Sequence, residues 1–282
     1  MNPPPLDNPT ALADHPLDNV DSDPTRRPET DRLADPAGCP GAGTDPAVLA
    51  RYRRPGRLFN PEFRVGLLGD LTGRRLLDVQ CGTGNYSVLF AELGAQVTGL
   101  DASPSDIETA RRRVAAAGVA DRCQLVCGPL DSTSLPNGTF DIVWTDSLLH
   151  QHIGQLPQLA RQLVAWTRPG GVVVFSEPVN FAPWLRRLRN FLPVASHGQA
   201  DERPLESAEV ALLRELLPDL RIEPFHLTSR LHRFVLTDHS YEKSSAPRRW
   251  AAWSMSLFDA IAFRLPGVAS LAGTAAIYGH RP

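Results

Sequence analysis

The stretch that most constrains this chain runs from Arg75 to Val88. It begins with a short apolar run, breaks into the turn Gly82-Thr83-Gly84, and continues with residues that favour a helix as far as Leu93. This order predicts a strand, a tight glycine turn and a helix. Because glycine has no Cβ and tolerates positive φ, such a turn lets a ligand approach bare backbone and points the free N–H groups of the helix toward it.

A second apolar run follows the predicted helix. It covers Gln96 to Asp101, and its closing acid stands 23 positions after Asp78. In a nucleotide-binding βαβ unit, an acid at the end of the second strand accepts hydrogen bonds from ribose hydroxyls. The spacing therefore indicates a nucleotide site. A nicotinamide or flavin dinucleotide fits less well, because Ser87 stands where that fingerprint has its third glycine.

Several segments resemble one family. Leu-Leu-Asp-Val-Gln-Cys-Gly-Thr-Gly at 76–84 and Gly-Leu-Asp-Ala-Ser at 99–103 look like the S-adenosylmethionine (SAM) site of the class I, Rossmann-like methyltransferases. Phe-Asp-Ile-Val at 140–143 and Pro-Gly-Gly at 169–171 are also features of that family. The resemblance covers about residues 70–180. It implies an α/β fold: a doubly wound, mostly parallel sheet with an antiparallel last strand, helices on both faces and a helical insertion after the fifth strand.

The resemblance also implies cofactor contacts. Asp78, Gly82 and Gly84 match the motif whose turn passes the methionine part and the ribose. Asp78 is expected near the turn amides or the methionine ammonium, and it could bond backbone N–H groups at the strand end at the same time. Asp101 matches the acid that binds the ribose. The other implied contacts are Ala102 beside the adenine, Leu130 through its backbone N–H, and Thr145 near the methyl group.

Two positions depart from the family pattern. Gln80 stands where the family usually has glycine, and Pro129 where it usually has an acid. Gln80 either points away from the cofactor or bonds its methionine carboxylate, and Asp131 could substitute for the missing acid. Either change could weaken SAM binding, so a non-catalytic member of the fold stays an alternative.

Candidate catalytic residues follow from the chemistry of methyl transfer. Alignment of nucleophile, methyl carbon and sulfur can contribute roughly 7–11 kcal/mol, and a base is needed only when the acceptor must lose a proton. His150 and His152 follow the fourth predicted strand, and histidine titrates near neutrality. Because the two histidines are two positions apart, we expect at most one of them to face the site. The alternative to a catalytic base is a histidine that bonds the loop backbone. Glu177, at the end of the fifth predicted strand, could orient an amine or hydroxyl, or cap backbone.

The remaining elements alternate as a parallel α/β sheet requires. Expected strands are 75–79, 96–100, 123–127, 140–145, 172–176, about 222–227 and 275–279, and expected helices are 85–93, Ser103 or Ser105 to 117, 155–167 and 207–217. Residues 250–263 are apolar with few charges. Residues 45–70 either cover the cofactor cleft or pack on the sheet.

The predicted domain organisation has two parts. Residues 1–45 are acidic and proline-rich, which predicts a disordered tail. Residues 46–282 form the methyltransferase domain, with an acceptor-pocket or lid insertion at about 181–270. Within it, residues 181–192 are amphipathic, with arginines opposite the apolar side. They could form an ordinary surface helix, a lid over an apolar acceptor, or a weak contact with a membrane surface or another anionic group.

Composition narrows the function. A net charge of -2 argues against a nucleic-acid partner, and no apolar run approaches the roughly 20 residues of a membrane span. No secretory signal is evident, and the four cysteines lack metal or disulfide spacing, so we expect a cytoplasmic protein without a metal. The prediction is SAM-dependent methylation of a small specialised or lipid-related metabolite. A non-catalytic binding or scaffold protein and an RNA or protein methyltransferase are the alternatives; acceptor, methylated atom and oligomeric state stay open.

Overall fold

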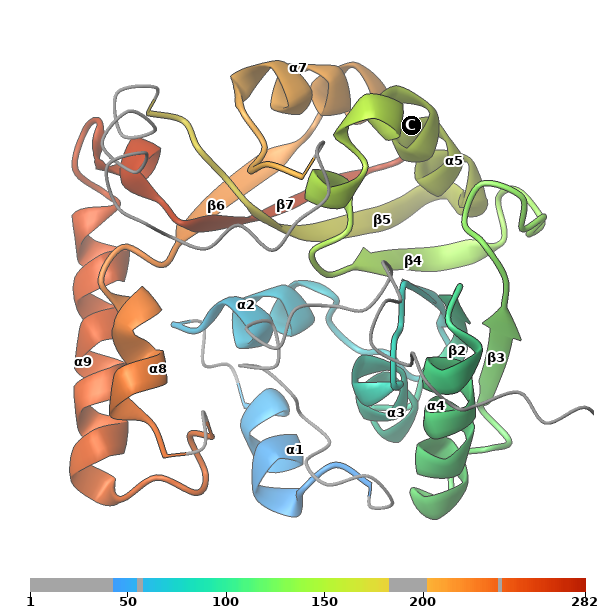
Figure 1. Cartoon of the computed structure of the whole chain (residues 1–282), viewed down its shortest axis with the longest axis horizontal. Coiled ribbons are helices and arrows are strands. Elements are labelled where there is room, and N and C mark those ends of the chain that lie inside the picture. The colour runs from blue at the N-terminus through green and yellow to red at the C-terminus, as the bar shows by residue number, and fades with distance from the viewer. Residues whose placement is uncertain (1–42, 55–57, 183–201, 238–239) are drawn as a thin grey trace, which may run out of the picture.

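A computed structural model describes residues 43–54, 58–182, 202–237 and 240–282. Its centre is a seven-stranded sheet in the order β3-β2-β1-β4-β5-β7-β6 (Figure 1). The strands are β1 Arg75–Val79, β2 Gln96–Asp101, β3 Cys123–Cys127, β4 Phe140–Thr145, β5 Thr167–Pro178, β6 Arg221–Phe225 and β7 Thr274–His280. β1 to β5 are parallel, whereas β7 runs antiparallel to both β5 and β6. The expected sheet, with its antiparallel last strand, is confirmed.

Helices cover both faces of the sheet, which explains why its central strands are continuous apolar runs. α5 (Leu156–Trp166) and α7 (Ser207–Leu216) lie on one face, and α2 (Asn60–Leu67), α3 (Asn85–Glu92) and α4 (Pro104–Ala116) lie on the other (Figure 1). Each face has its own hydrophobic core. α4 begins as expected, with the Ser103 hydroxyl accepting a hydrogen bond from the Asp106 N–H at 3.3 Å.

The segment before β1 packs on the sheet. It forms α1 (Pro46–Tyr52) and α2, and Arg64 of α2 is only 1% exposed. The Arg64 guanidinium lies 4.2 Å from the centre of the Trp144 ring and forms an ion pair with Asp146 at 3.1 Å. Because an aromatic face and a carboxylate together stabilise a buried guanidinium, Arg64 anchors α2 on the end of β4. Of the two expectations for this segment, the structure therefore supports packing on the sheet.

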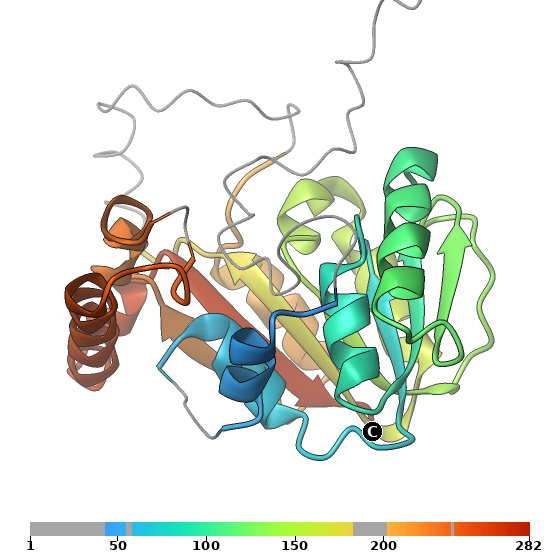
Figure 2. The ribbon, with the colours of Figure 1, turned by 90° about the horizontal axis from the view of Figure 1, so that it is seen from below.

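An insertion connects β6 to β7. It contains η4 (Ser229–Leu231), α8 (His232–Val235), α9 (Ala246–Ala262) and η5 (Val268–Leu271). Because β6 runs parallel to β5, this insertion leaves and re-enters the sheet at the edge where β1, β2, β4 and β5 end (Figures 1 and 2). The apolar residues 250–263 are thus mostly a helix.

Two predictions fall beyond these residues. The tail at 1–45 lies almost wholly outside the described residues, as does most of the amphipathic stretch 181–192. Both stay predictions, together with the domain boundaries drawn from them. In the described part of the chain, no helix combines the length and apolar character that crossing a bilayer requires.

Candidate active site

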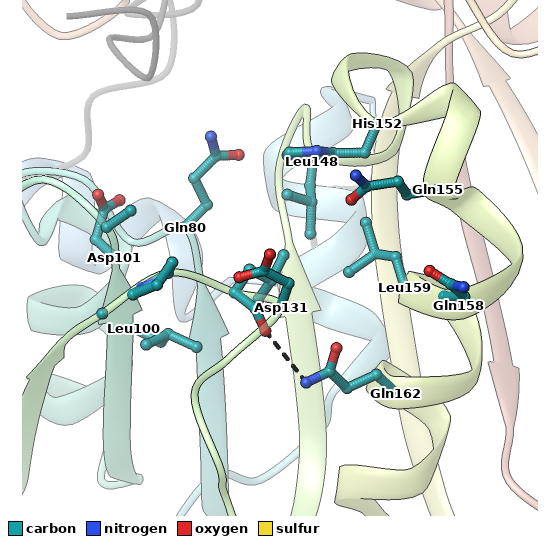
Figure 3. A pocket seen from close by; sticks show the side chains of 14 residues that line it. Gln80, Leu100, Asp101, Asp131, Leu148, His152, Gln155, Gln158, Leu159 and Gln162 are labelled. Atoms are coloured by element: carbon teal, nitrogen blue, oxygen red, sulfur yellow. Dashed lines mark hydrogen bonds between the residues drawn. The ribbon is translucent and has the colours of Figure 1, made fainter.

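A pocket opens at the edge of the sheet where the parallel strands end. Its volume is about 350 Å³, within the range of small-molecule sites. Strand order reverses between β1 and β4, and ligands of open α/β sheets bind at this kind of switch point. Figure 3 shows the side chains around it. The lining residues are Gln80, Leu100, Asp101, Ala102, Gly128, Pro129, Leu130, Asp131, Leu148, His152, Gln155, Gln158, Leu159 and Gln162.

Asp101 joins the end of β2 to the glycine turn. Its carboxylate accepts the Gly82 N–H at 2.7 Å and the Ser103 N–H at 2.9 Å. The side chain therefore has a fixed position on the pocket wall, although the residue is only 6% exposed. A carboxylate has about four acceptor sites, so two bonds to the backbone leave capacity for ligand hydroxyls.

The two glycines of the turn serve different needs. Gly82 has a φ of 53°, and an added Cβ there would meet nothing within 4 Å, so its backbone lies beside open space. Gly84 has a φ of 79°, and an added Cβ would lie 2.9 Å from the Cβ of Ala110. Gly84 thus permits α3 to begin directly against α4. Neither glycine lines the pocket; Gly82 contacts it through Asp101.

Two of the predicted cofactor residues are buried outside the pocket lining. Asp78 is 2% exposed and accepts the Ser87 hydroxyl at 2.6 Å, which ties β1 to the start of α3. Thr145 is fully buried at the end of β4, and its carbonyl accepts a hydrogen bond from Arg64 at 3.5 Å. Neither lines the pocket, whereas Ala102 and Leu130 do. The printed partner of Asp78 is thus a side-chain hydroxyl, and its predicted roles toward SAM and toward backbone N–H groups stay predictions.

Gln80 adopts a backbone conformation that explains why the family has glycine there. Its φ is 58°, in the left-handed region that side chains with a Cβ rarely adopt. The side chain extends between Asp101 and Leu148 (Figure 3). It donates to the Gln151 side chain at 3.3 Å. Gln80 therefore forms part of the pocket wall and leaves the pocket open.

Glu177 organises the turn that follows β4. The residue is fully buried, and its carboxylate accepts the N–H groups of Leu148 at 2.9 Å, Leu149 at 2.8 Å and His150 at 3.2 Å. It also lies 2.9 Å from Nδ1 of His150. Because an ionised carboxylate only accepts hydrogen bonds, this contact assigns the proton to Nδ1. Glu177 lies outside the pocket lining, so this geometry favours backbone capping over contact with an acceptor.

The two candidate histidines diverge, as their spacing predicted. His150 is 7% exposed and paired with Glu177, whereas His152 lines the pocket. Burial lowers the pKa of the His152 imidazole below its ordinary value, with a further decrease from His150 and opposition from Glu177 and Asp131. His152 is therefore mostly neutral at pH 7, the form in which an imidazole accepts a proton.

One wall of the pocket was not foreseen. Gln155, Gln158 and Gln162 lie at positions i, i+3 and i+7 along the start of α5 and line one side. Gln162 donates to the Leu130 carbonyl at 3.1 Å, which holds the loop after β3 against α5 (Figure 3). The helical spacing of these glutamines is a signal that the sequence carried.

Comparisons with known proteins agree with this geometry. Residues 76–171 match the family described as "Methyltransferase domain". The matched segment runs from β1 into β5. A malonyl-[acyl-carrier protein] O-methyltransferase from Serratia marcescens is 36% identical to this chain over 135 residues, covering 48% of each chain. A ubiquinone biosynthesis O-methyltransferase from Bordetella avium is 34% identical over 140 residues, covering 46% of this chain and 57% of the relative.

The fold extends further than the sequence similarity. A solved geranyl diphosphate methyltransferase in complex with SAM superposes with a TM-score of 0.51 at 17% identity, covering 88% of this chain and 94% of the other. At that identity the likeness concerns the fold alone. The chain spans about half the length of the curated relatives it matches.

Proposed function

We propose that this protein is an enzyme that transfers a methyl group from SAM to a small-molecule acceptor. The observation that carries the proposal is Asp101: it belongs to a methyltransferase domain, stands at the end of β2 and faces a pocket at the switch point of the sheet. The names of the two relatives, both O-methyltransferases of lipid-related substrates, support a hydroxyl or carboxyl oxygen as the methylated atom.

The pocket residues suit SAM. The fixed carboxylate of Asp101 retains acceptor capacity for two ribose hydroxyls, and the turn at Gly82 exposes backbone beside it. Leu100, Ala102 and Leu130 supply apolar contact for an adenine ring, and the exposed Asp131 is the acid available to its amino group. Pro129 thus replaces the acid that the family usually has there, but the pocket contains a different acid, Asp131, two positions later.

When bound, SAM supplies an electrophilic methyl group on its sulfonium sulfur. His152 faces the same space and is the residue we assign to accept a proton from the acceptor. Glu177 holds the backbone of residues 148–150 and thereby the turn that leads to His152. Leu148 and Leu159 exclude water on the side where His152 lies. The predicted absence of a metal and the cytoplasmic location stay predictions.

Transfer of a labelled methyl group tests the proposal. The full chain is incubated with SAM labelled in its methyl group and a panel of metabolites that carry hydroxyl or carboxyl groups on an apolar skeleton. The expected result is label in at least one acceptor, with loss of transfer in the His152→Ala variant where that acceptor is a hydroxyl that must lose a proton. SAM binding without transfer to any small molecule, but with transfer to RNA or protein, would overturn the assignment of a small acceptor.

A further inference from the structure

The most exposed large apolar side chains in the described part of the chain lie outside the pocket lining. Seven large apolar residues in the described part of the chain are at least 38% exposed, and all of them lie between residues 231 and 265. They are Leu231, Phe234, Trp250, Trp253, Phe258, Ile261 and Leu265. Four belong to α9, where their spacing places them on one helical face. Exposed apolar groups gathered in this way mark interaction sites.

The large apolar side chains of α9 face outward, whereas those of an ordinary surface helix face the core. Its buried residues are small or polar, whereas Trp250 and Phe258 are 71% and 56% exposed. The buried positions are Ala252, Ser256, Asp259 and Ala262. An ordinary surface helix would turn its aromatic face to the core.

Asp259 fixes this orientation. Its carboxylate accepts the N–H groups of Leu227 at 3.0 Å, Thr228 at 2.8 Å and Ser229 at 3.0 Å, and the Thr228 hydroxyl at 2.6 Å. Burial opposes ionisation, but the hydrogen bonds from Thr228 and Ser229 lower the pKa of Asp259 below its ordinary value. Rotating α9 to bury its tryptophans would leave these buried donors without an acceptor, which is costly. The outward apolar face is therefore part of the folded structure.

Cations outnumber acids in the insertion that carries this face. Residues 226–273 contain six lysine or arginine residues and three acidic ones. Of the two acids there that the structure describes, Glu242 pairs with Arg51 at 2.8 Å and Asp259 is 4% exposed. Arg248 is exposed and Arg249 is half-buried at the start of α9, and the Arg233 guanidinium lies 4.7 Å from the centre of the exposed Phe234 ring. The surface thus combines aromatic rings with positive charge.

We propose that the outer face of α9, with Trp250, Trp253, Phe258 and Ile261, docks the protein on the surface of an anionic lipid bilayer. Aromatic and aliphatic groups enter the boundary between headgroups and acyl chains, and nearby arginines bind anionic headgroups. The contact is peripheral, and it does not depend on methyl transfer.

The charge pattern favours lipid over a second copy of the chain. A symmetric dimer through α9 would bring the same arginines together from both copies, with no exposed acid in the described part of the insertion to compensate. An anionic bilayer supplies the opposite charge over its whole area. The insertion also leaves the sheet at the edge that holds the pocket, so docking would bring that edge near the lipid.

Sedimentation with vesicles tests the proposal in the full chain. Vesicles of phosphatidylcholine with phosphatidylglycerol should carry the protein down, vesicles of phosphatidylcholine alone should do so weakly, and high salt should weaken binding. The double variant Trp250→Ser with Trp253→Ser removes two exposed rings. The double variant Arg248→Gln with Arg249→Gln removes two charges. Each should lower the partition coefficient by about tenfold or more.

The matched control is Arg111→Gln with Arg112→Gln, two adjacent exposed arginines on α4. This variant should bind vesicles like the wild type, and all variants should keep the wild-type melting temperature. Equal loss in the control contradicts the proposal, because it shows a diffuse charge effect. Unchanged binding in both α9 variants, with loss on substitution within residues 181–192, assigns the contact to that stretch and also overturns it. A dimer that the tryptophan variant dissociates, without vesicle binding, overturns it in favour of a second copy.

Discussion

Replacing Glu177 should destabilise the fold far more than a typical single substitution. Its buried carboxylate accepts three backbone N–H groups and the Nδ1–H of His150. Glu177→Ala leaves four buried donors without an acceptor. Each such donor costs about 1–3 kcal/mol, and neighbours that share one acceptor do not add fully, so we expect a loss of roughly 4–6 kcal/mol.

Glu177→Gln should cost less. The amide oxygen can keep the bonds to Leu148 and Leu149, and its NH₂ group can donate to Nδ1 of His150 if that ring changes tautomer. Only the His150 backbone N–H then lacks its acceptor, which predicts a loss of about 1–3 kcal/mol.

Urea denaturation at pH 7, followed by far-UV circular dichroism, measures both variants. The urea concentration at the unfolding midpoint should be highest for the wild type, lower for Glu177→Gln and lowest for Glu177→Ala. The dependence of the unfolding free energy on urea concentration should stay constant. Glu215→Ala on the exposed side of α7 is the matched control and should stay within about 0.5 kcal/mol of wild type. If Glu177→Ala unfolds at the wild-type urea concentration but lacks activity, the carboxylate contacts the acceptor and the structural assignment is wrong.

Three further outcomes are expected. His152→Ala should lower turnover by about 100-fold or more for an acceptor that loses a proton, with stability unchanged, whereas His150→Ala should mainly lower stability; equal effects would contradict their different positions. Burial lowers the pKa of His226 to about 4, so the unfolded chain binds more protons between pH 4 and 6.5 and stability should rise with pH across that window. His226→Asn, which tolerates the φ of 63°, should flatten that rise in urea titrations at several pH values. Gln80→Gly removes a left-handed side chain and should keep SAM affinity while raising stability by up to about 1 kcal/mol; a tenfold loss of affinity would show that Gln80 holds the cofactor.

The centre of the sheet could be predicted because its strands are apolar runs closed by recognisable turns. Arg75–Val79 has the predicted bounds, since burial between two helical layers leaves its pattern unambiguous. Cys123–Cys127 also has the predicted bounds, although it is an edge strand with no buried residue. The Ser103 cap of α4 could also be predicted, because its hydroxyl and the N–H of Asp106 are only three residues apart in the sequence.

Contacts distant in sequence could not be predicted. Arg64 reaches Asp146 across 82 positions, and no local pattern marks that an arginine of α2 lies on the Trp144 ring. The site was partly foreseen. Motif spacing placed Asp101 on the pocket wall, but it could not show that Asp78 and Thr145 are buried outside the lining, because strand-end side chains alternate between faces.

The reversed face of α9 illustrates a further limit. Its sequence has the spacing of an amphipathic helix, and such spacing predicts a buried apolar side. The opposite orientation follows from Asp259, whose partners at 227–229 are some 30 positions earlier in the chain.

Calorimetric titration of SAM into the wild type and Asp101→Ala measures the nucleoside site most directly. The variant loses a charged acceptor for ribose hydroxyls, so its affinity should fall by at least about tenfold, an expected loss of ~1.5–3 kcal/mol. Asp121→Ala, an exposed acid before β3, should bind like the wild type. A folded Asp101→Ala protein that binds SAM with wild-type affinity, or a wild type that binds none, would contradict the assignment of this pocket to SAM.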